Sequence, residues 1–158
     1  MPPKNTIFGV MFDEFRNRMP TDEPDLKIGR FLLWVSGYTA INQKSQGDFA
    51  YLRTPTLLVA DNIIVFSELS DTPIFGFKKF LEELLSMYEN ISVKQVIEFS
   101  SDNSEFSLKL TNDLGQIRID IKYYSWLHNG ALEFEEHIDQ SYLPKIINDL
   151  KIILTRHY

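Results

Sequence analysis

The sequence predicts an α+β fold, in which an antiparallel, possibly mixed, β-sheet containing a meander packs against two main α-helices and a possible N-terminal helix. Three observations support this prediction. Residues 72–90 and 141–155 repeat apolar side chains with the 3.6-residue period of a helix. Segments between residues 95 and 138 alternate apolar and polar side chains with the period of a strand. Short polar connectors separate those segments, which favours antiparallel neighbours.

The first 68 residues predict one short helix followed by strands. Phe8, Phe12, Phe15 and Met19 lie on one helical face that ends at Pro20, and residues 21–25 read as a loop. Residues 26–41 are apolar on both alternating faces, which predicts a strand covered on both sides. Residues 49–68 predict two or three short strands, with one ending at Pro55 and a tight turn at residues 61–62.

The first main helix is expected to begin with Thr72 as its N-cap and Pro73 at its first position, and to end at Asn90. Four strands follow in the prediction, at residues 95–100, 105–111, 116–124 and 131–138. Gly115 and the pair Asn129-Gly130 mark two of the turns, because both residue types tolerate positive φ. These strands form an antiparallel meander.

The last helix is expected after a cap at Asp139 or Ser141 and carries a regular apolar stripe of Leu143, Ile146, Ile147, Leu150, Ile153 and Leu154. We expect this helix to lie on the apolar face of the meander. Leu132 and Phe134 would then point inward beneath it, while Glu133, Glu135 and His137 point to solvent.

The composition is that of an ordinary globular chain. With 158 residues, 44% of them hydrophobic, we expect a single domain spanning residues 1–158. The sequence contains no cysteine, which excludes disulfides, thiolate metal sites and a cysteine nucleophile. The N-terminus lacks the apolar run of a signal peptide, and no segment approaches the ~18 apolar residues of a membrane span. We therefore expect a cytoplasmic protein without a membrane partner.

Negative charge is concentrated in one part of the chain. The formal net charge is −6, and residues 98–139 hold nine acidic against three basic side chains, which also gives −6. Such a segment repels nucleic acid and attracts a basic protein surface. Within it we predict five partner-binding residues, Asp113, Asp120, Trp126, Glu133 and Glu135. A core-lining role for Tyr123 and Trp126 is an equally open interpretation.

No recognised catalytic motif is present, because the sequence lacks dinucleotide-binding, P-loop, zinc-protease and serine-hydrolase signatures. His137 follows Glu135 by two residues, so an acid–base pair or half of a metal site is conceivable, with His128 as a second ligand. Glu133 and Asp120 could serve as the paired carboxylates of a glycosidase. A surface histidine among solvated carboxylates explains the same pattern more simply. We therefore predict neither a catalytic residue nor a metal or cofactor.

The order of elements resembles that of the WapI-type immunity proteins, which are encoded beside bacterial polymorphic or contact-dependent toxins. The resemblance is carried by residues 26–155, in particular FGFKKFLEELLSMY, SLKLTNDLGQIRIDIKYY and LEFEEHIDQSYLPKIINDLKIIL. It implies a non-catalytic inhibitor that binds the C-terminal domain of a cognate toxin, frequently a nuclease, and has no catalytic residues. From the acidic segment we expect a partner with a basic surface, and we expect the chain itself to be a monomer or weak homodimer.

Two other classes stay open at this point. One is a small enzyme or ligand-binding domain with a pocket between the sheet and the helices. The other is a scaffold subunit whose meander edge pairs with a second copy of itself.

Overall fold

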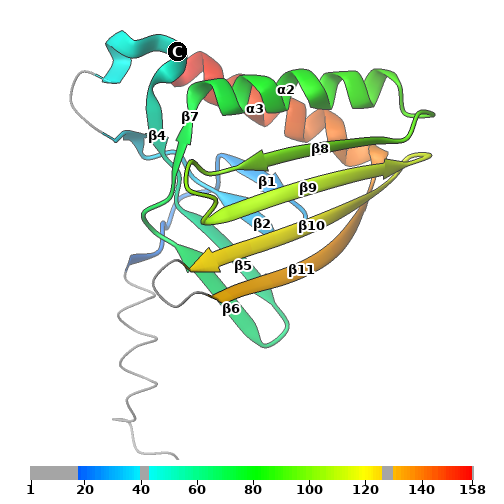
Figure 1. Ribbon diagram of the computed structural model, residues 1–158, viewed down its shortest axis with the longest axis horizontal. Coiled ribbons are helices and arrows are strands. Elements are labelled where there is room, and N and C mark those ends of the chain that lie inside the picture. The colour runs from blue at the N-terminus through cyan, green and yellow to red at the C-terminus, as the bar shows by residue number, and fades with distance from the viewer. Residues whose placement is uncertain (1–17, 40–42, 126–129, 158) are drawn as a thin grey trace, which may run out of the picture.

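The computed structural model describes residues 18–39, 43–125 and 130–157, and it confirms the α+β class, with three antiparallel sheets and two long helices (Figure 1). The predicted N-terminal helix lies almost entirely outside the described residues, as do Trp126 and Asn129. None of the helices in the described ranges has the length and apolar character that crossing a bilayer requires.

The first sheet has the strand order β1-β2-β5-β6 and the third has the order β3-β4-β7. Their strands are β1 (Leu26–Ile28), β2 (Phe31–Leu33), β3 (Gly37–Tyr38), β4 (Tyr51–Arg53), β5 (Thr56–Ala60), β6 (Ile63–Ser67) and β7 (Asp71–Pro73). A 3-10 segment, η1 (Gln43–Phe49), precedes β4. The turn at residues 61–62 is confirmed, because Ala60 pairs with Ile63 across it.

The expectation of one strand over residues 26–41 is wrong. The chain reverses at Gly29, whose φ of +57° is accessible to glycine at little cost, and β1 pairs with β2 as a hairpin. Leu26 and Leu33 are opposite each other in this hairpin and both are fully buried. Residues 26–41 therefore contain three short strands, β1 and β2 in the first sheet and β3 in the third.

The meander is confirmed as a four-stranded sheet with the order β11-β10-β9-β8. Its strands are β8 (Gln95–Ser100), β9 (Phe106–Asp113), β10 (Gln116–Ser125) and β11 (Gly130–Asp139). Leu114 and Gly115 both have positive φ in the β9–β10 turn, as a two-residue hairpin loop requires.

The two helices are α2 (Ile74–Glu89) and α3 (Leu143–His157), and the short 3-10 segment η2 (Gln140–Tyr142) leads into α3. The predicted start of α2 is wrong by about one residue, because Pro73 is the N-cap and provides no side-chain hydrogen bond. Thr72 is instead buried in β7, where its hydroxyl lies 2.8 Å from that of Thr54. Asn90 ends α2 as predicted.

The hydrophobic core lies between the meander and the two elements that pack on it, α2 and the first sheet. On the β8 side α2 packs against the sheet, and Phe80 stacks on Phe99 with ring centroids 4.6 Å apart. On the β10 side the first sheet covers the meander, because Phe31 contacts both Phe106 and Tyr123. The apolar stripe of α3 is buried as predicted.

The placement of α3 over Leu132 and Phe134 is wrong. The helix packs mainly against α2 and β1. Phe134 instead lines a small hollow with Leu58 and Ala60 of β5, and Leu132 lies beside Val65 of β6 with 46% of its surface exposed. The far edge of the meander therefore faces the first sheet.

Candidate functional site

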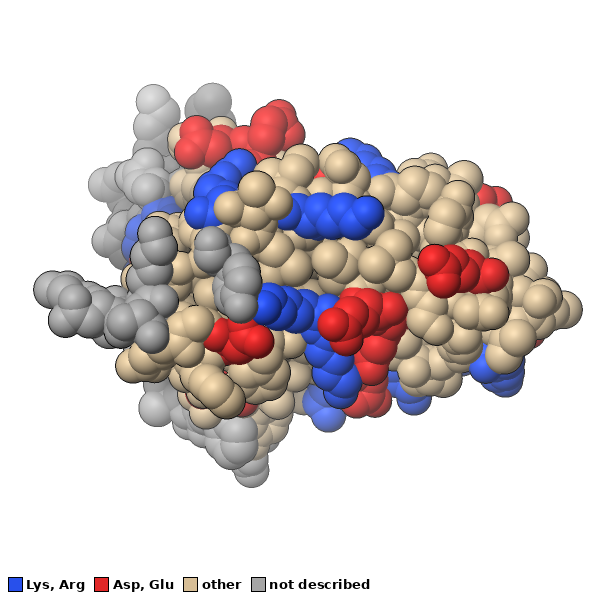
Figure 2. Space-filling view, turned by 90° about the horizontal axis from the view of Figure 1, so that it is seen from above, with Lys and Arg blue, Asp and Glu red and all other residues tan. Residues whose placement is uncertain are grey.

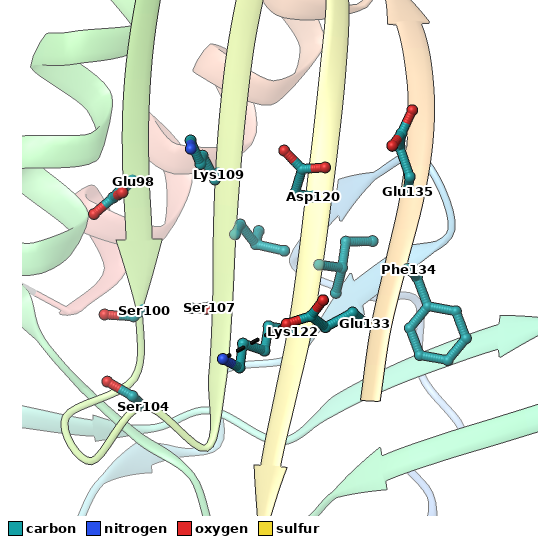
Figure 3. Close-up of a pocket in the computed structure, with 12 residues that line it drawn as sticks. Glu98, Ser100, Ser104, Ser107, Lys109, Asp120, Lys122, Glu133, Phe134 and Glu135 are labelled. Atoms are coloured by element: carbon teal, nitrogen blue, oxygen red, sulfur yellow. Dashed lines mark ion pairs between the residues drawn. The ribbon is translucent and has the colours of Figure 1, made fainter. Parts of the chain in front are cut away.

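The outer face of the meander is the candidate site, and strand pairing arranges its side chains in rows. One row runs across all four strands through Glu98, Lys109, Asp120 and Glu135, and the next through Ser100, Ser107, Lys122 and Glu133. Figure 3 shows both rows on the same side of the sheet, with Phe134 directed away from them. The rows exist because the apolar residues between them point into the core.

A shallow hollow of about 590 Å³ lies over these two rows. Its lining combines carboxylates, amines and the hydroxyls of Ser100, Ser104 and Ser107. Those groups can form ion pairs and hydrogen bonds with a polar surface, and Leu108, Ile121 and Phe134 add apolar side chains to the same lining.

The predicted acidic face is more mixed in charge than the sequence window indicated. Three bases share the outer face with six carboxylates, which gives a formal charge of 3 − 6 = −3; the bases are Lys109, Arg118 and Lys122, and the carboxylates are Glu98, Asp113, Asp120, Glu133, Glu135 and Asp139. Arg118 lies 3.1 Å from Asp120, and Lys122 lies 3.6 Å from Glu133. The outer face of β8 and β9 carries one more carboxylate than bases, and that of β10 and β11 carries two more, because Glu135 and Asp139 add to the paired Asp120 and Glu133.

Three carboxylates of the acidic segment, Glu105, Glu136 and Asp139, accept hydrogen bonds within the protein. Glu136 points to the opposite side of β11 and accepts a hydrogen bond of 2.8 Å from the backbone N–H of Arg30. Asp139 caps η2 by accepting a hydrogen bond from the backbone N–H of Ser141, which holds the pKa of Asp139 below its usual value. Glu105 accepts a hydrogen bond of 2.7 Å from the hydroxyl of Ser101.

Four of the five predicted site residues, Asp113, Asp120, Glu133 and Glu135, lie on this face. Trp126 is outside the described residues, whereas Tyr123 is 6% exposed and belongs to the core. The three bases were counted in the charge of the segment, but they were not among the predicted site residues. The signal for them was in the sequence, because Lys109 and Lys122 fall on the polar positions of the same alternation that exposes the acids.

Charges are also interspersed on the side of the molecule that carries the helices. Figure 2 looks down on the molecule from that side. It shows acidic and basic side chains intermixed, with uncharged surface between the charged groups. Two opposite-charge pairs on the helices, Lys79 with Glu83 and Lys145 with Asp149, contribute to this pattern. Among the described residues visible in Figure 2, neither positive nor negative charge dominates.

The sequence suggested an acid–base pair or a metal site at His137, Glu135 and His128, and the structure describes the first two of these residues. His137 lies 3.0 Å from Glu135, and both side chains are more than half exposed. His128 lies outside the described residues. Across those residues, no group of three or more histidine, cysteine, aspartate or glutamate side chains is placed to hold a metal ion.

Comparison with known proteins gives one informative match. The model of the immunity protein WapI-like family matches residues 63–157, which run from β6 to the end of α3 and contain the entire outer face. No curated protein matches the sequence. A chain from the crystal structures of Trypanosoma bruciei MRP1/MRP2 aligns over 96% of this chain and 92% of its own, with 12% identity and a TM-score of 0.31, a likeness too weak to inform fold or function.

Proposed function

Because the chain belongs to the immunity protein WapI-like family, we propose that it binds a cognate toxin domain and neutralises it by forming a stoichiometric complex. The single observation that carries this proposal is the family match over residues 63–157. The protein acts in the cytoplasm as a non-catalytic inhibitor, and its partner is the C-terminal domain of the toxin.

The outer face of the meander is the contact surface in this proposal. A toxin that cleaves nucleic acid needs a basic surface to hold its substrate, and an excess of carboxylates attracts that surface. Asp120, Glu133 and Glu135 lie on the β10–β11 side, where Arg118 and Lys122 pair with the first two, so that Glu135 contributes to the excess of negative charge. A contact of standard size buries on the order of 1,600 Å² in total. The proposed contact also includes Asp113 and Trp126.

The bases on the same face have a role in selecting the partner. Lys109 and Lys122 lie among the carboxylates, so a partner must place acidic groups opposite them as well as basic groups opposite the acids. Juxtaposition of like charges disfavours a toxin with another charge pattern. Specificity for one cognate toxin follows from this arrangement.

Co-expression tests the proposed function. The chain is expressed together with the C-terminal domain of the effector encoded immediately upstream, and growth is compared with that of cells expressing the domain alone. We expect restored growth and a complex of 1:1 stoichiometry in sedimentation. Lack of protection together with lack of binding between the purified proteins would exclude the proposal.

A further inference from the structure

β11 forms one margin of the meander, and its second side is not paired with another described strand. It ends the strand order β11-β10-β9-β8, and within residues 18–39, 43–125 and 130–157 it pairs only with β10. Figure 1 shows it along the margin that lies opposite α2. Its 10 residues keep an unbroken register with β10. A regular edge of this length is a template for one more strand.

One hydrogen bond fixes which backbone groups face that margin. The N–H of Gln140 donates to the C=O of Gly115, and these two residues continue the register of β10 and β11. In an antiparallel pair, the residues that exchange hydrogen bonds alternate along each strand. The even-numbered residues of β11 therefore bond to β10. The N–H and C=O groups of Glu133 and Glu135 point away from β10, toward the margin.

The side chains of the same two residues select the chemistry of an added strand. Glu133 and Glu135 project from the outer face, and their side chains are 74% and 57% exposed. A residue opposite either of them in an added strand would have its Cβ about 5 Å away, where opposite charges stabilise the pair and like charges destabilise it. The strand that fits therefore carries Lys or Arg at two alternate positions.

The residue between those two positions would face the inner side of β11. A hollow of about 180 Å³ lies on that side, and its apolar lining consists of Leu58, Ala60, Ile121 and Phe134. Arg30 and Glu136 also line it, and their charged groups lie 3.9 Å apart and compensate each other. Phe134 is only partly buried. An apolar side chain of the added strand would cover it, so the fitting strand alternates basic and apolar residues.

A second copy of β11 does not meet this requirement. In antiparallel self-pairing the outer-face side chains lie opposite one another, so the registers with nearly complete overlap are centred on residue 134, 135 or 136. In each of them Glu133 or Glu135 lies opposite a carboxylate of the second copy. Residues 1–17 do not meet it either, because their two bases, Lys4 and Arg16, are too far apart in sequence to occupy alternate positions.

We propose that the toxin domain adds an extended segment to β11, with Lys or Arg opposite Glu133 and Glu135 and an apolar residue between them. This inference rests on the proposed function and states how the partner engages one side of the contact surface. Main-chain hydrogen bonds supply affinity in this mode of recognition, and the alternating side chains supply specificity. The carboxylates of β11 disfavour an acidic strand, which protects the margin from unselective pairing.

Amide hydrogen exchange, followed by NMR on the full natural chain, tests these backbone groups individually. The probe is the C-terminal domain of the effector encoded immediately upstream. In the free protein the N–H groups of Glu133 and Glu135 should exchange rapidly, while the N–H of Phe134 is protected by its bond to β10. Adding the domain should slow exchange at Glu133 and Glu135 by about tenfold or more, because each N–H then donates to the added strand. Unchanged exchange in the complex would overturn the inference. Slow exchange in the free protein would show that another segment already covers the margin and would also overturn it.

The opposite margin of the same sheet supplies the matched control. The hydrogen bond from the N–H of Ser101 to the C=O of Phe106 continues the register of β8 and β9. By the same alternation, the N–H of Glu98 points away from β9. Glu98 also lies in the same cross-strand row as Glu135. Its exchange should show no comparable slowing in the complex.

Proline substitution separates the contribution of the main chain from that of the charge. Glu135→Pro and Glu135→Ala both remove the carboxylate, but only Glu135→Pro removes the N–H that faces the margin. Proline is tolerated at such a position of an edge strand because no bond to β10 is lost, and circular dichroism verifies the fold. Glu135→Pro should bind the toxin domain about tenfold more weakly than Glu135→Ala, since a buried hydrogen bond is lost. Glu98→Pro and Glu98→Ala should not differ from each other.

The outcomes separate this inference from the proposed function. If the natural chain binds the domain and the two Glu135 variants bind it equally, strand addition is excluded while toxin binding stands. If the natural chain forms no complex with the domain, the proposed function and the inference are both excluded.

Discussion

Glu136 on the edge strand of the meander accepts a hydrogen bond from the backbone N–H of Arg30, a residue 106 positions earlier in the β1–β2 turn. The same carboxylate occupies the space beside Gly29, where an added Cβ would lie 2.3 Å from Oε2 of Glu136. One carboxylate thus joins the two sheets at a position where the chain turns with positive φ.

Gly29→Ala should destabilise the protein by about 1–2 kcal/mol, because alanine in the left-handed region is strained. The carboxylate of Glu136 must also move aside and lose its hydrogen bond to Arg30. Chemical denaturation measures the loss. If displacement of the Glu136 carboxylate is part of the loss, Gly29→Ala should lower the free energy of unfolding by less in a Glu136→Ala background than in the natural chain. Strict additivity would show that the carboxylate does not contribute.

Tyr123→Phe should lower the free energy of unfolding by about 1–3 kcal/mol, since it leaves a buried hydroxyl without its partner. The Tyr123 hydroxyl donates to Oγ1 of Thr56 over 3.1 Å, and Thr56 is fully buried between the two sheets. Adding Thr56→Val should restore much of the stability, because both polar groups are then absent. Tyr88→Phe on the surface of α2 is the control and should have little effect.

Acidification should destabilise the protein partly through His157. Burial lowers the pKa of this histidine from its ordinary 6.5, and the neighbouring Arg156 lowers it further, while Asp25 partly offsets both. The folded state therefore takes up a proton less readily than the unfolded chain. Stability from this residue is complete above pH 6.5 and is lost as the pH falls through the lowered pKa.

Urea midpoints at pH 7.5 and pH 5.5 test this prediction. His157→Gln should lose less stability between the two values than the natural chain does. His137→Gln, which changes an exposed histidine on the outer face, should retain the natural pH dependence. Identical pH dependence in all three proteins would contradict the assignment.

Glu133→Lys combined with Glu135→Lys should weaken toxin binding by about tenfold or more at low salt, because it replaces attraction by repulsion on the β10–β11 side. The salt dependence of the association rate should also become weaker. Isothermal titration and stopped-flow mixing measure the two quantities. Glu82→Lys with Glu89→Lys makes the same change of charge on exposed positions of α2 and should have a much smaller effect. Unchanged binding would remove the outer face from the contact.

Trp126→Ala should weaken the same complex by about 2 kcal/mol or more if Trp126 is an anchor of the interface. If Trp126 is such an anchor, the free energy of unfolding of the Trp126→Ala variant should differ little from that of the natural protein. A large loss of stability with normal toxin binding in the remaining folded protein would instead favour the core-lining interpretation considered from the sequence.

The local elements could be predicted because each depends on neighbours in the chain. The apolar stripe of α3 and the alternation of apolar and polar residues in β9 and β10 indicate which side chains are buried in the core. The start of α2 was less accurate, because Thr72 is an ordinary N-cap residue in sequence but is drawn into a buried hydrogen bond with Thr54. A partner 18 positions away leaves no local signal.

By itself, the sequence determined the class of fold, the four strands of the meander, and the exposure of Asp120, Glu133 and Glu135. Those features follow from local periods of 2 and 3.6 residues. The tertiary structure decided that residues 26–33 form a hairpin over the meander, that Glu136 reaches Arg30, and that Lys109 and Lys122 stand among the carboxylates. The physical reason is that charges and hydrogen bonds act over a few ångströms in space, and only the pairing of distant strands brings these groups within that range.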